Sequence, residues 1–417
     1  MNNNHDLIII GGGAAGLIAG ISAKTFYPQA KVTILEKNDA CGKKLLITGK
    51  GRCNITTSNT NIPSFIEVIG KNGKWLRDAL TQFSIAETID FFVSLGIKVQ
   101  EERGNRIFPE SANASFVRDK LIEKIKELGV EIRCTSTVKE VQINDSFTLT
   151  TKNGHKYVTN NLLIATGGLS YPTTGSTGDG YLFAQESGHT IITPTPSLIG
   201  IKCQEVWIRE LAGLTLNNVK AEIYQNNKKH LEKFGDLLFT HVGVSGPIIL
   251  DMSKDIHHLI SSRLTPTQLS LDLKPAVSPQ LLDARVQRIC QDEGKKNIKS
   301  LITKLLPGKM IDVFIALNKL DANNKLSEIK KEERIKIITS LKKTIITLTE
   351  VEGFDKAIIT SGGVSLKEVN PKNMEYKMVK NLFLAGEVLD LDGPTGGYNL
   401  QIAWSTGYLV GKSIICS

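Results

Sequence analysis

The chain has 417 residues, of which 41% are hydrophobic and 22% are charged, and its net charge is +9. This composition is typical of a folded globular protein and excludes a disordered or fibrous chain, and the length suffices for two or three domains. The six cysteines form no C-x-x-C pair, so we expect neither a metal site nor a disulfide framework.

The N-terminal segment predicts a βαβ unit. A short apolar run at 7–10 indicates a buried strand, the glycine-rich segment 11–16 follows at once, and an apolar helix is expected at 17–24. A second strand, 31–35, ends at Glu36. Glycines interrupt the only long uncharged stretch near the N-terminus, which makes it neither a membrane helix nor a signal peptide. We therefore expect a cytoplasmic protein without a membrane partner.

The glycine-rich turn carries the spacing of a dinucleotide-binding site. Gly11, Gly13 and Gly16 form G-x-G-x-x-G after the strand, and Glu36 follows twenty residues after Gly16. In this motif the first glycine permits the tight turn, the second lets a pyrophosphate approach the backbone, and the third lets helix and strand pack. The helix N-terminus stabilises the phosphates, and Glu36 can accept hydrogen bonds from the adenosine ribose.

Two later strands favour FAD over NAD. The apolar runs 161–165 and 381–385 each lead into a glycine turn, and we expect both strands in the same sheet. Gly386 and Glu387 resemble the C-terminal flavin motif, in which an acidic residue reaches the ribityl chain. The helix expected to begin near 396–399 would aim its positive end at the flavin, where it stabilises the anionic reduced ring.

The middle of the chain differs from both ends in its pattern of apolar and polar residues and is predicted to be an insertion. Alternating segments predict a small β-barrel at 191–277, and 278–349 is expected to be helical, so the cofactor-binding domain comprises 1–190 and 350–417. Residues 281–345 hold 15 Lys and Arg against 8 Asp and Glu, which gives +7 of the total charge. This excess indicates either a solvated helical surface or a site for an anionic partner such as RNA.

Four segments together resemble the bacterial BaiN/RdsA-type flavoproteins, also called aminoacetone-oxidase-like or YhiN-like. They are 43–54 (KKLLITGKGRCN), 239–247 (FTHVGVSGP), 360–364 (TSGGV) and 385–401, which contains AGEVLD and GGYNLQ. The resemblance covers essentially the whole chain. It implies an α/β fold with a Rossmann-like FAD-binding domain of the two-part glutathione-reductase type, an inserted small β-barrel and a helical subdomain.

The family resemblance implies an FAD-dependent oxidoreductase but more than one reaction. The leading hypothesis is hydride transfer from flavin N5 to a conjugated C=C–C=O bond, with uridine in 23S ribosomal RNA as substrate and dihydrouridine as product. One alternative is a small-molecule flavoenzyme, either an enone reductase of the bile-acid type or an aminoacetone or amine oxidase that produces peroxide. Another is an RNA-binding flavoprotein without turnover. No second G-x-G-x-x-G follows a strand, so NAD(P)H is expected to dock transiently as reductant.

Hydride addition needs a proton donor, and two residues are candidates. Cys53 lies in a glycine-rich loop beside Arg52, whose charge would lower a thiol pKa. His241 lies between an apolar strand and Gly243, in a segment of the insertion that could fold back over the flavin. Both residues also have a structural interpretation, Cys53 as a small buried residue of the tight loop and His241 as a histidine whose hydrogen bonds are satisfied within the fold.

The remaining predicted site residues are expected to bind the cofactor. They are Gly11, Gly13, Ala14, Ala15, Gly16, Glu36, Lys37, Lys44, Thr48, Gly49, Arg52, Asn54, Val138, Thr166, Gly167, Gly386, Glu387, Gly397, Tyr398, Asn399 and Leu400.

Overall fold

The structure is a computed structural model that describes residues 4–262 and 265–414. The chain forms two compact units, and the second, Leu198–Gly353, is inserted into the first. The first unit therefore comprises the described residues up to Ser197 together with those from Phe354 onward.

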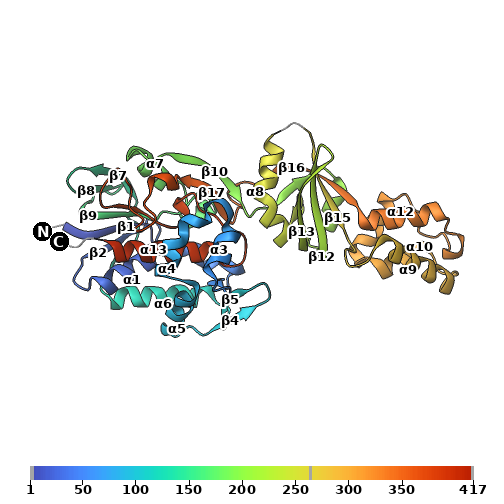
Figure 1. The fold of residues 1–417 in the computed structure, drawn as a ribbon, viewed down its shortest axis with the longest axis horizontal. Helices are drawn as coiled ribbons and strands as arrows, with labels where there is room; N and C mark the ends of the chain where they lie inside the picture. Colours follow the sequence, from blue (N-terminus) through green and yellow to red (C-terminus); the bar gives the residue numbers. More distant parts are fainter. Residues whose placement is uncertain (1–3, 263–264, 415–417) are drawn as a thin grey trace. The chain divides into compact units, whose positions relative to one another are not determined.

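The first unit is built on a seven-stranded sheet with the strand order β6-β2-β1-β9-β8-β7, in which β18 also pairs with β9 (Figure 1). The strands are β1 (Asn4–Ile10), β2 (Val32–Leu35), β6 (Glu131–Arg133), β7 (Val138–Ile143), β8 (Phe147–Thr151), β9 (Lys156–Ile164) and β18 (Leu382–Leu384). The pairs of β1 with β2 and β9, of β2 with β6, and of β9 with β18 are parallel. This sheet confirms the predicted Rossmann-like fold, and it brings the carboxyl ends of β1, β2, β9 and β18 to one edge.

Helices cover this sheet, and the first and last of them, α1 and α13, pack on each other. The helices are α1 (Ala14–Phe26), α2 (Lys43–Ile47), α3 (Ile62–Ile69), α4 (Arg77–Gln82), α5 (Ile85–Ser94), α6 (Ala114–Glu127), α7 (Asp179–Glu186) and α13 (Tyr398–Ser413). Between α1 and α13, Ser22 Oγ donates to the Tyr408 carbonyl oxygen at 2.8 Å. Among the described residues, no helix is long and apolar enough to cross a bilayer.

Two smaller sheets complete the first unit. One contains β3 (Thr56–Thr57), β4 (Val99–Glu102) and β5 (Arg106–Pro109), and the other pairs β10 (Ile191–Ser197) with β17 (Ile359–Val364). Residues 191–197 were predicted to belong to the insertion, but they form β10, which pairs with β17 of the first unit. β10 contains two prolines, Pro194 and Pro196. They are accommodated because, among the described strands, β10 pairs with β17 alone and its register shifts between Ile192 and Thr195.

The second unit contains a closed six-stranded barrel with the order β11-β14-β13-β12-β15-β16. Its strands are β11 (Ile201–Cys203), β12 (Thr215–Gln225), β13 (Lys228–Phe239), β14 (Gly243–Ser245), β15 (Thr267–Asp272) and β16 (Thr344–Val351), and α8 (Pro247–Ser261) packs against the barrel. The predicted β-barrel is thereby confirmed. The last strand, β16, comes after the helices and closes the barrel because it pairs with both β11 and β15.

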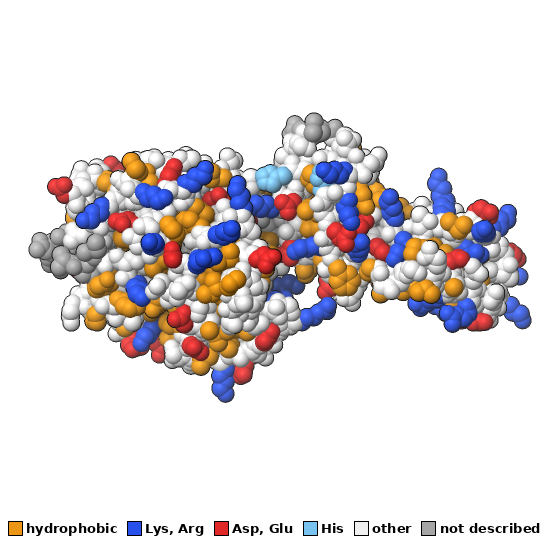
Figure 2. Space-filling view, in the orientation of Figure 1, with side chains coloured by type: hydrophobic (Ala, Val, Ile, Leu, Met, Phe, Trp, Pro, Cys, Tyr) orange, Lys and Arg blue, Asp and Glu red, His pale blue; other side chains and the backbone are white. Residues whose placement is uncertain are grey.

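Between β15 and β16 the chain forms a helical subdomain of α9 (Pro279–Asp292), α10 (Ile298–Leu305), α11 (Ile311–Leu317) and α12 (Lys331–Lys342). Its helices begin at sequence-encoded caps, since Ser278 Oγ accepts from Leu281 N–H and Asn297 Oδ1 accepts from Ser300 N–H. Figure 2 shows Lys and Arg side chains spread over the surface of this subdomain. The charge excess noted in the sequence therefore lies on a folded, exposed surface.

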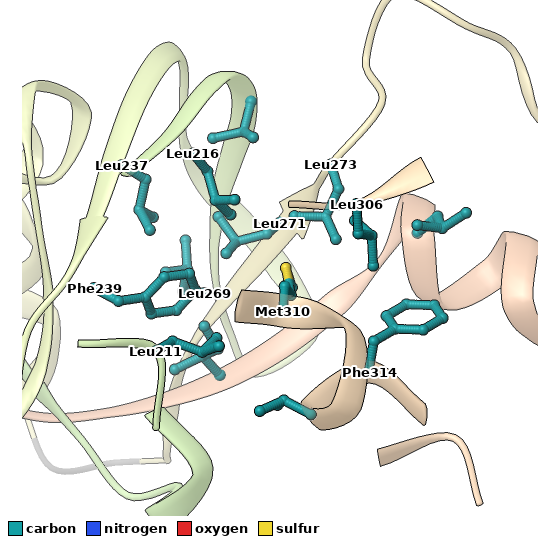
Figure 3. Close-up of a cluster of buried hydrophobic side chains, with 14 of the residues drawn as sticks. Leu211, Leu216, Leu237, Phe239, Leu269, Leu271, Leu273, Leu306, Met310 and Phe314 are labelled. Atoms are coloured by element: carbon teal, nitrogen blue, oxygen red, sulfur yellow. The ribbon is translucent and has the colours of Figure 1, made fainter. Parts of the chain in front are cut away.

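The barrel and the helical subdomain share one hydrophobic core. Figure 3 shows Phe239 and Leu269 from the barrel and Met310 and Phe314 from the helices in one cluster of buried side chains. All four side chains are almost completely buried. Because burial of apolar surface stabilises both parts together, we expect the second unit to unfold as one cooperative body.

His189, which lies between α7 and β10, is expected to make the stability of the first unit depend on pH. Its ring stacks on Tyr376 with centroids 3.3 Å apart, and among the described residues its Nε2 has no hydrogen-bond partner. Burial lowers the pKa of His189 below 6.5. The unfolded chain therefore takes up a proton at a pH where the folded chain does not, so the free energy of unfolding decreases as the pH falls below about 6.5.

The test is thermal unfolding of wild-type protein and the His189→Phe variant between pH 7.5 and 5. We expect the variant to lose less stability on acidification than wild type does. The exposed His155→Gln is the control for removing a histidine elsewhere. Equal pH dependence of wild type and His189→Phe would contradict the assignment.

Candidate functional site

A cleft of about 1290 Å³, including the open space at its mouth, lies at the sheet edge where the parallel strands end. This is where ligands bind in open α/β sheets, and the size is that of a cofactor site. The residues that line it all belong to the first unit. The predicted residues among them are Gly11, Gly13, Ala14, Ala15, Glu36, Lys37, Lys44, Thr48, Val138, Thr166, Gly167, Gly386, Glu387, Asn399 and Leu400.

The turn from β1 to α1 forms one wall of this cleft. Gly11 has φ +106°, and a Cβ placed there would lie 2.4 Å from the Ala165 carbonyl oxygen at the end of β9. A Cβ at Gly13 would meet no atom within 4 Å, so the backbone there faces open space. No side chain caps α1 at Gly13 or α13 at Gly397. Both helix N-termini therefore keep amide groups available for an anion or a polar ring.

Glu36, at the end of β2, is positioned by the backbone of the same wall. Its carboxylate accepts from Gly12 N–H at 2.8 Å and from the backbone N–H and side-chain amide of Asn38, both at 2.8 Å. Glu36 is almost completely buried but lines the cleft. These bonds hold an acceptor at a fixed place, as recognition of ribose hydroxyls requires.

Glu387, after β18, is the centre of a second polar cluster. Its carboxylate pairs with Lys44 Nζ at 2.8 Å and accepts from Ser170 Oγ at 2.6 Å and from Thr360 N–H at 2.9 Å. Lys44 Nζ also lies 3.0 Å from Ser170 Oγ. The cluster connects α2, which carries Lys44, to the segments at β9, β17 and β18 that carry Ser170, Thr360 and Glu387. These polar groups are therefore fixed relative to one another.

The cleft fits FAD on observations of its own residues. Thr166 Oγ1 is buried and has no hydrogen-bond partner among the described residues, although it lines the cleft. Buried hydroxyls normally have a partner, so this one is available to a ligand. With the open backbone at Gly13, the fixed carboxylates of Glu36 and Glu387 and two uncapped helices, the cleft has acceptors for ribose and ribityl hydroxyls and donors for a pyrophosphate.

Six of the predicted cofactor-binding residues do not line the cleft. These are Gly16, Gly49, Arg52, Asn54, Gly397 and Tyr398. Several have structural tasks instead. A correctly oriented Asn54 amide donates to the carbonyl oxygens of Thr56 and Ile107 and accepts from Gly397 N–H. The Tyr398 ring packs on Phe65 with centroids 4.9 Å apart.

The expectation that Arg52 lowers the pKa of Cys53 is wrong. The Arg52 guanidinium pairs with Glu102 at 2.7 Å and lies over the ring of Phe108 at 4.1 Å. Cys53 is completely buried with φ +62° and does not line the cleft. Burial raises the pKa of its thiol to about 12, against a smaller opposing effect of a hydrogen bond with Thr48.

Cys53 is therefore expected to behave as an inert buried thiol. Iodoacetamide at pH 8 should leave it unmodified in the folded protein, because the thiolate is the reacting form and almost none is present. Peptide mass spectrometry measures this, with the partly exposed Cys290 as internal control. Rapid labelling of Cys53, or loss of a limb of the pH–rate profile in Cys53→Ala, would instead place the thiol in the reaction.

His241 belongs to the second unit. It lies on the turn between β13 and β14, is exposed, and is not among the residues that line the cleft. It lines a smaller hollow at the rim of the barrel together with Lys202 and Arg209. The ring of His241 is therefore open to solvent and is not part of the buried core.

Three of the residues that hold the two carboxylates were not among the predicted site residues. Asn38, Ser170 and Thr360 make the contacts to Glu36 and Glu387 described above. Thr360 begins one of the motif segments and Asn38 lies two residues after Glu36, so both carried a local signal. Ser170 carried none, because its role depends on β9 and β18 being neighbours.

These features together define an α/β dinucleotide-binding protein of the flavoprotein class. The chain belongs to the family of the HI0933-like protein Rossmann domain, whose model matches residues 5–413. The predicted family is confirmed, and the protein is an FAD-dependent oxidoreductase by family.

Three curated relatives match over nearly their full length. The chain is 30% identical to a 3-dehydro-bile acid delta(4,6)-reductase of Clostridium scindens over 97% of this chain and 98% of the relative. It is 29% identical to a ribosomal RNA dihydrouridine synthase of Haemophilus influenzae, covering 99% of each chain. A protein of the same name from Escherichia coli is 28% identical, over 99% of this chain and 98% of the relative.

Solved flavoenzyme structures share the fold at low sequence identity. A 3-ketosteroid-delta4-(5alpha)-dehydrogenase from Rhodococcus jostii aligns with a TM-score of 0.53 and 14% identity over 98% of this chain and 96% of that one. A flavocytochrome c3 fumarate reductase aligns with a TM-score of 0.52 and 16% identity over 98% and 78%. At these identities the likeness concerns the fold.

Proposed function

We propose that this protein reduces uridine to dihydrouridine in 23S ribosomal RNA, with NAD(P)H as the electron donor. The observation that carries the RNA substrate is the charge of the helical subdomain, +7 over residues 281–345, on a part of the chain remote in sequence from the cofactor motifs. The two relatives named ribosomal RNA dihydrouridine synthase support the same substrate. Such a substrate also agrees with the expected cytoplasmic location.

The residues of the cleft bind and orient the cofactor in this proposal. Glu36 would accept from the adenosine ribose, the α1 N-terminus would offer its amide groups to the pyrophosphate, and Glu387 would accept from the ribityl chain. The chemistry that FAD would supply when bound is a hydride for the β-carbon of a conjugated C=C–C=O bond, and uracil C5=C6 is such a bond. Lys44 neutralises Glu387 and keeps its carboxylate fixed while the cofactor is held.

A proton must also reach the α-carbon of the substrate. Of the two predicted donors, Cys53 is buried with a pKa near 12, whereas His241 is exposed on its turn. Histidine is the side chain used most often for proton transfer. The buried thiol of Cys53 is therefore given a structural role in its loop, and His241 stays the other predicted donor.

A second candidate function is reduction of a small conjugated ketone. The 30% identity to the 3-dehydro-bile acid delta(4,6)-reductase favours it. The chemistry at the cleft is the same for both candidates, so the substrate alone separates them. If the substrate is a small ketone, the charged residues of the helical subdomain form a solvated surface that binds no partner.

The deciding experiment is nucleoside mass spectrometry. Unmodified 23S ribosomal RNA is incubated with the FAD-loaded protein and NADPH, and dihydrouridine is measured against a reaction without NADPH. Formation of dihydrouridine at a defined position establishes the RNA substrate. A flavin that NADPH reduces, with no dihydrouridine formed but turnover of a steroid enone, would overturn the RNA substrate in favour of the second candidate.

A further inference from the structure

The turn between β15 and α9 presents a lysine in a fixed position. Lys274 N–H donates to Asp272 Oδ1 at 2.9 Å, and Val277 N–H donates to the Lys274 carbonyl oxygen at 3.1 Å. Lys342 Nζ donates to the carbonyl oxygens of Lys274 and Val277 at 3.0 and 2.9 Å. The backbone that carries Lys274 is therefore held by three sets of hydrogen bonds.

The Lys274 side chain shares this place with a second cation, Arg285 of α9. Lys274 is half-buried, and burial followed by the nearby Arg285 guanidinium lowers its pKa. The adjacent carboxylates are taken by other cations, since Asp272 pairs with Lys342 at 2.6 Å and Asp283 pairs with Arg334 at 2.5 Å. Within residues 4–262 and 265–414, no ion pair joins Lys274 or Arg285 to a carboxylate.

The positive surface continues along the subdomain. Arg288 lies three residues after Arg285, so the two side chains are neighbours on one face of α9, and both are exposed. Lys331 at the start of α12 lies close enough to Asp283 to act on its charge. We call Lys274, Arg285 and Arg288 the α9 cationic surface.

Two unpaired cations that repel each other are an arrangement that an anion stabilises. A phosphate between Lys274 and Arg285 would remove the repulsion, and arginine offers a planar set of donors that matches phosphate geometry. An RNA backbone carries one phosphate per nucleotide, so a row of cations along a helix can bind several in sequence.

We propose that the α9 cationic surface binds the phosphate backbone of the RNA substrate. The proposal rests on the proposed function and names the surface that holds the partner. Contacts of this kind position the RNA without selecting its sequence, so they place the second unit on the substrate and leave the choice of uridine to the cleft.

The test uses the FAD-loaded full chain and an unmodified 23S ribosomal RNA transcript as probe. The dissociation constant is measured by filter binding over a series of salt concentrations for wild type and for Lys274→Gln/Arg285→Gln. We expect the double variant to bind at least tenfold more weakly, and the slope of log K against log salt to fall by about 1–2, since each phosphate contact contributes close to 1. The variant removes no ion pair between described residues, so its melting temperature should stay close to that of wild type.

Two further double variants test whether RNA binding depends on the α9 cationic surface itself or only on the total positive charge of the subdomain. Lys319→Gln/Lys325→Gln removes two exposed lysines from the loops after α11 in the same subdomain and should change binding less than twofold. Lys274→Arg/Arg285→Lys keeps both charges and should retain most of the affinity. Equal losses in the two Gln double variants would overturn the α9 cationic surface in favour of general charge.

The outcomes also distinguish this proposal from the proposed function. Dihydrouridine formation with unchanged RNA binding in Lys274→Gln/Arg285→Gln overturns the surface and leaves the function standing. A wild-type protein that neither binds the transcript nor forms dihydrouridine overturns both. Binding to vesicles of phosphatidylserine and phosphatidylcholine in place of RNA, lost in the same double variant, would overturn the RNA partner in favour of a lipid surface.

Discussion

Replacing Gly11 with alanine is expected to give a chain that retains no FAD and melts well below wild type. The backbone at φ +106° costs a residue with a side chain about 1–3 kcal/mol. The new methyl group would also lie 2.4 Å from the Ala165 carbonyl oxygen, which the backbone of β9 holds in place. The overlap therefore forces the β1–α1 turn away from β9 and opens the wall of the cleft. Flavin absorbance after gel filtration and thermal unfolding measure the two effects.

Two other glycine-to-alanine variants test whether the effect is specific to Gly11. Gly13→Ala has an ordinary extended backbone and no atom within 4 Å, so it should fold like wild type. Its methyl group would occupy the cleft where the pyrophosphate approaches, and we expect FAD to bind roughly tenfold more weakly. Gly308→Ala, in the second unit, also meets no atom and should change neither property. Retention of FAD by Gly11→Ala would show that the turn is not the cofactor wall.

Glu387→Gln is expected to weaken FAD binding at least tenfold and to destabilise the cofactor-free protein. The substitution leaves Lys44 without its counter-charge, in a pair whose side chains are only 24% and 16% exposed. Loss of one partner from a well-buried pair costs about 3–5 kcal/mol, and partial exposure reduces this to about 1–2 kcal/mol. The dissociation constant for FAD and the melting temperature of the cofactor-free chain report the two effects separately.

A double-mutant cycle shows whether the pair acts as a unit. Lys44→Met should destabilise the cofactor-free chain as Glu387→Gln does, and the double variant should be more stable than the sum of the single losses indicates. The neighbouring pair of Lys43 with Asp39 is the matched control, because the Asp39 side chain is 76% exposed. Asp39→Asn should therefore have little effect. Full FAD affinity in Glu387→Gln would exclude this carboxylate from the cofactor site.

The nucleotide-binding half of the cleft could be predicted from sequence because its determinants are local. Gly11 and Gly13 lie in one turn, and Glu36 ends the next strand, so spacing alone brings them together. The strand at β18 was also predictable, because an apolar run that leads into a glycine turn marks a parallel strand end. The positive charge of the helical subdomain could also be predicted, because it follows from the amino-acid composition of residues 281–345 alone.

Contacts between distant segments could not be predicted in the same way. Arg52 was expected to act on its neighbour Cys53. Its guanidinium instead pairs with Glu102 on β4, fifty residues further along the chain. The last barrel strand, β16, was included with the helices because only one residue, Lys343, separates it from α12. Its assignment to the barrel depends on its pairing with both β11 and β15, which are distant in sequence from each other.

The two ends of the inserted unit are joined to each other. Glu352 N–H donates to the Gly200 carbonyl oxygen at 3.1 Å, and β11 and β16, the first and last barrel strands, are paired. The host chain therefore leaves and returns at nearly the same point, so the insertion adds little closure entropy to the flavin domain. Residues 198–353 are for this reason a transplantable module: exchanging this module between relatives should change what is bound while the host domain still folds around FAD.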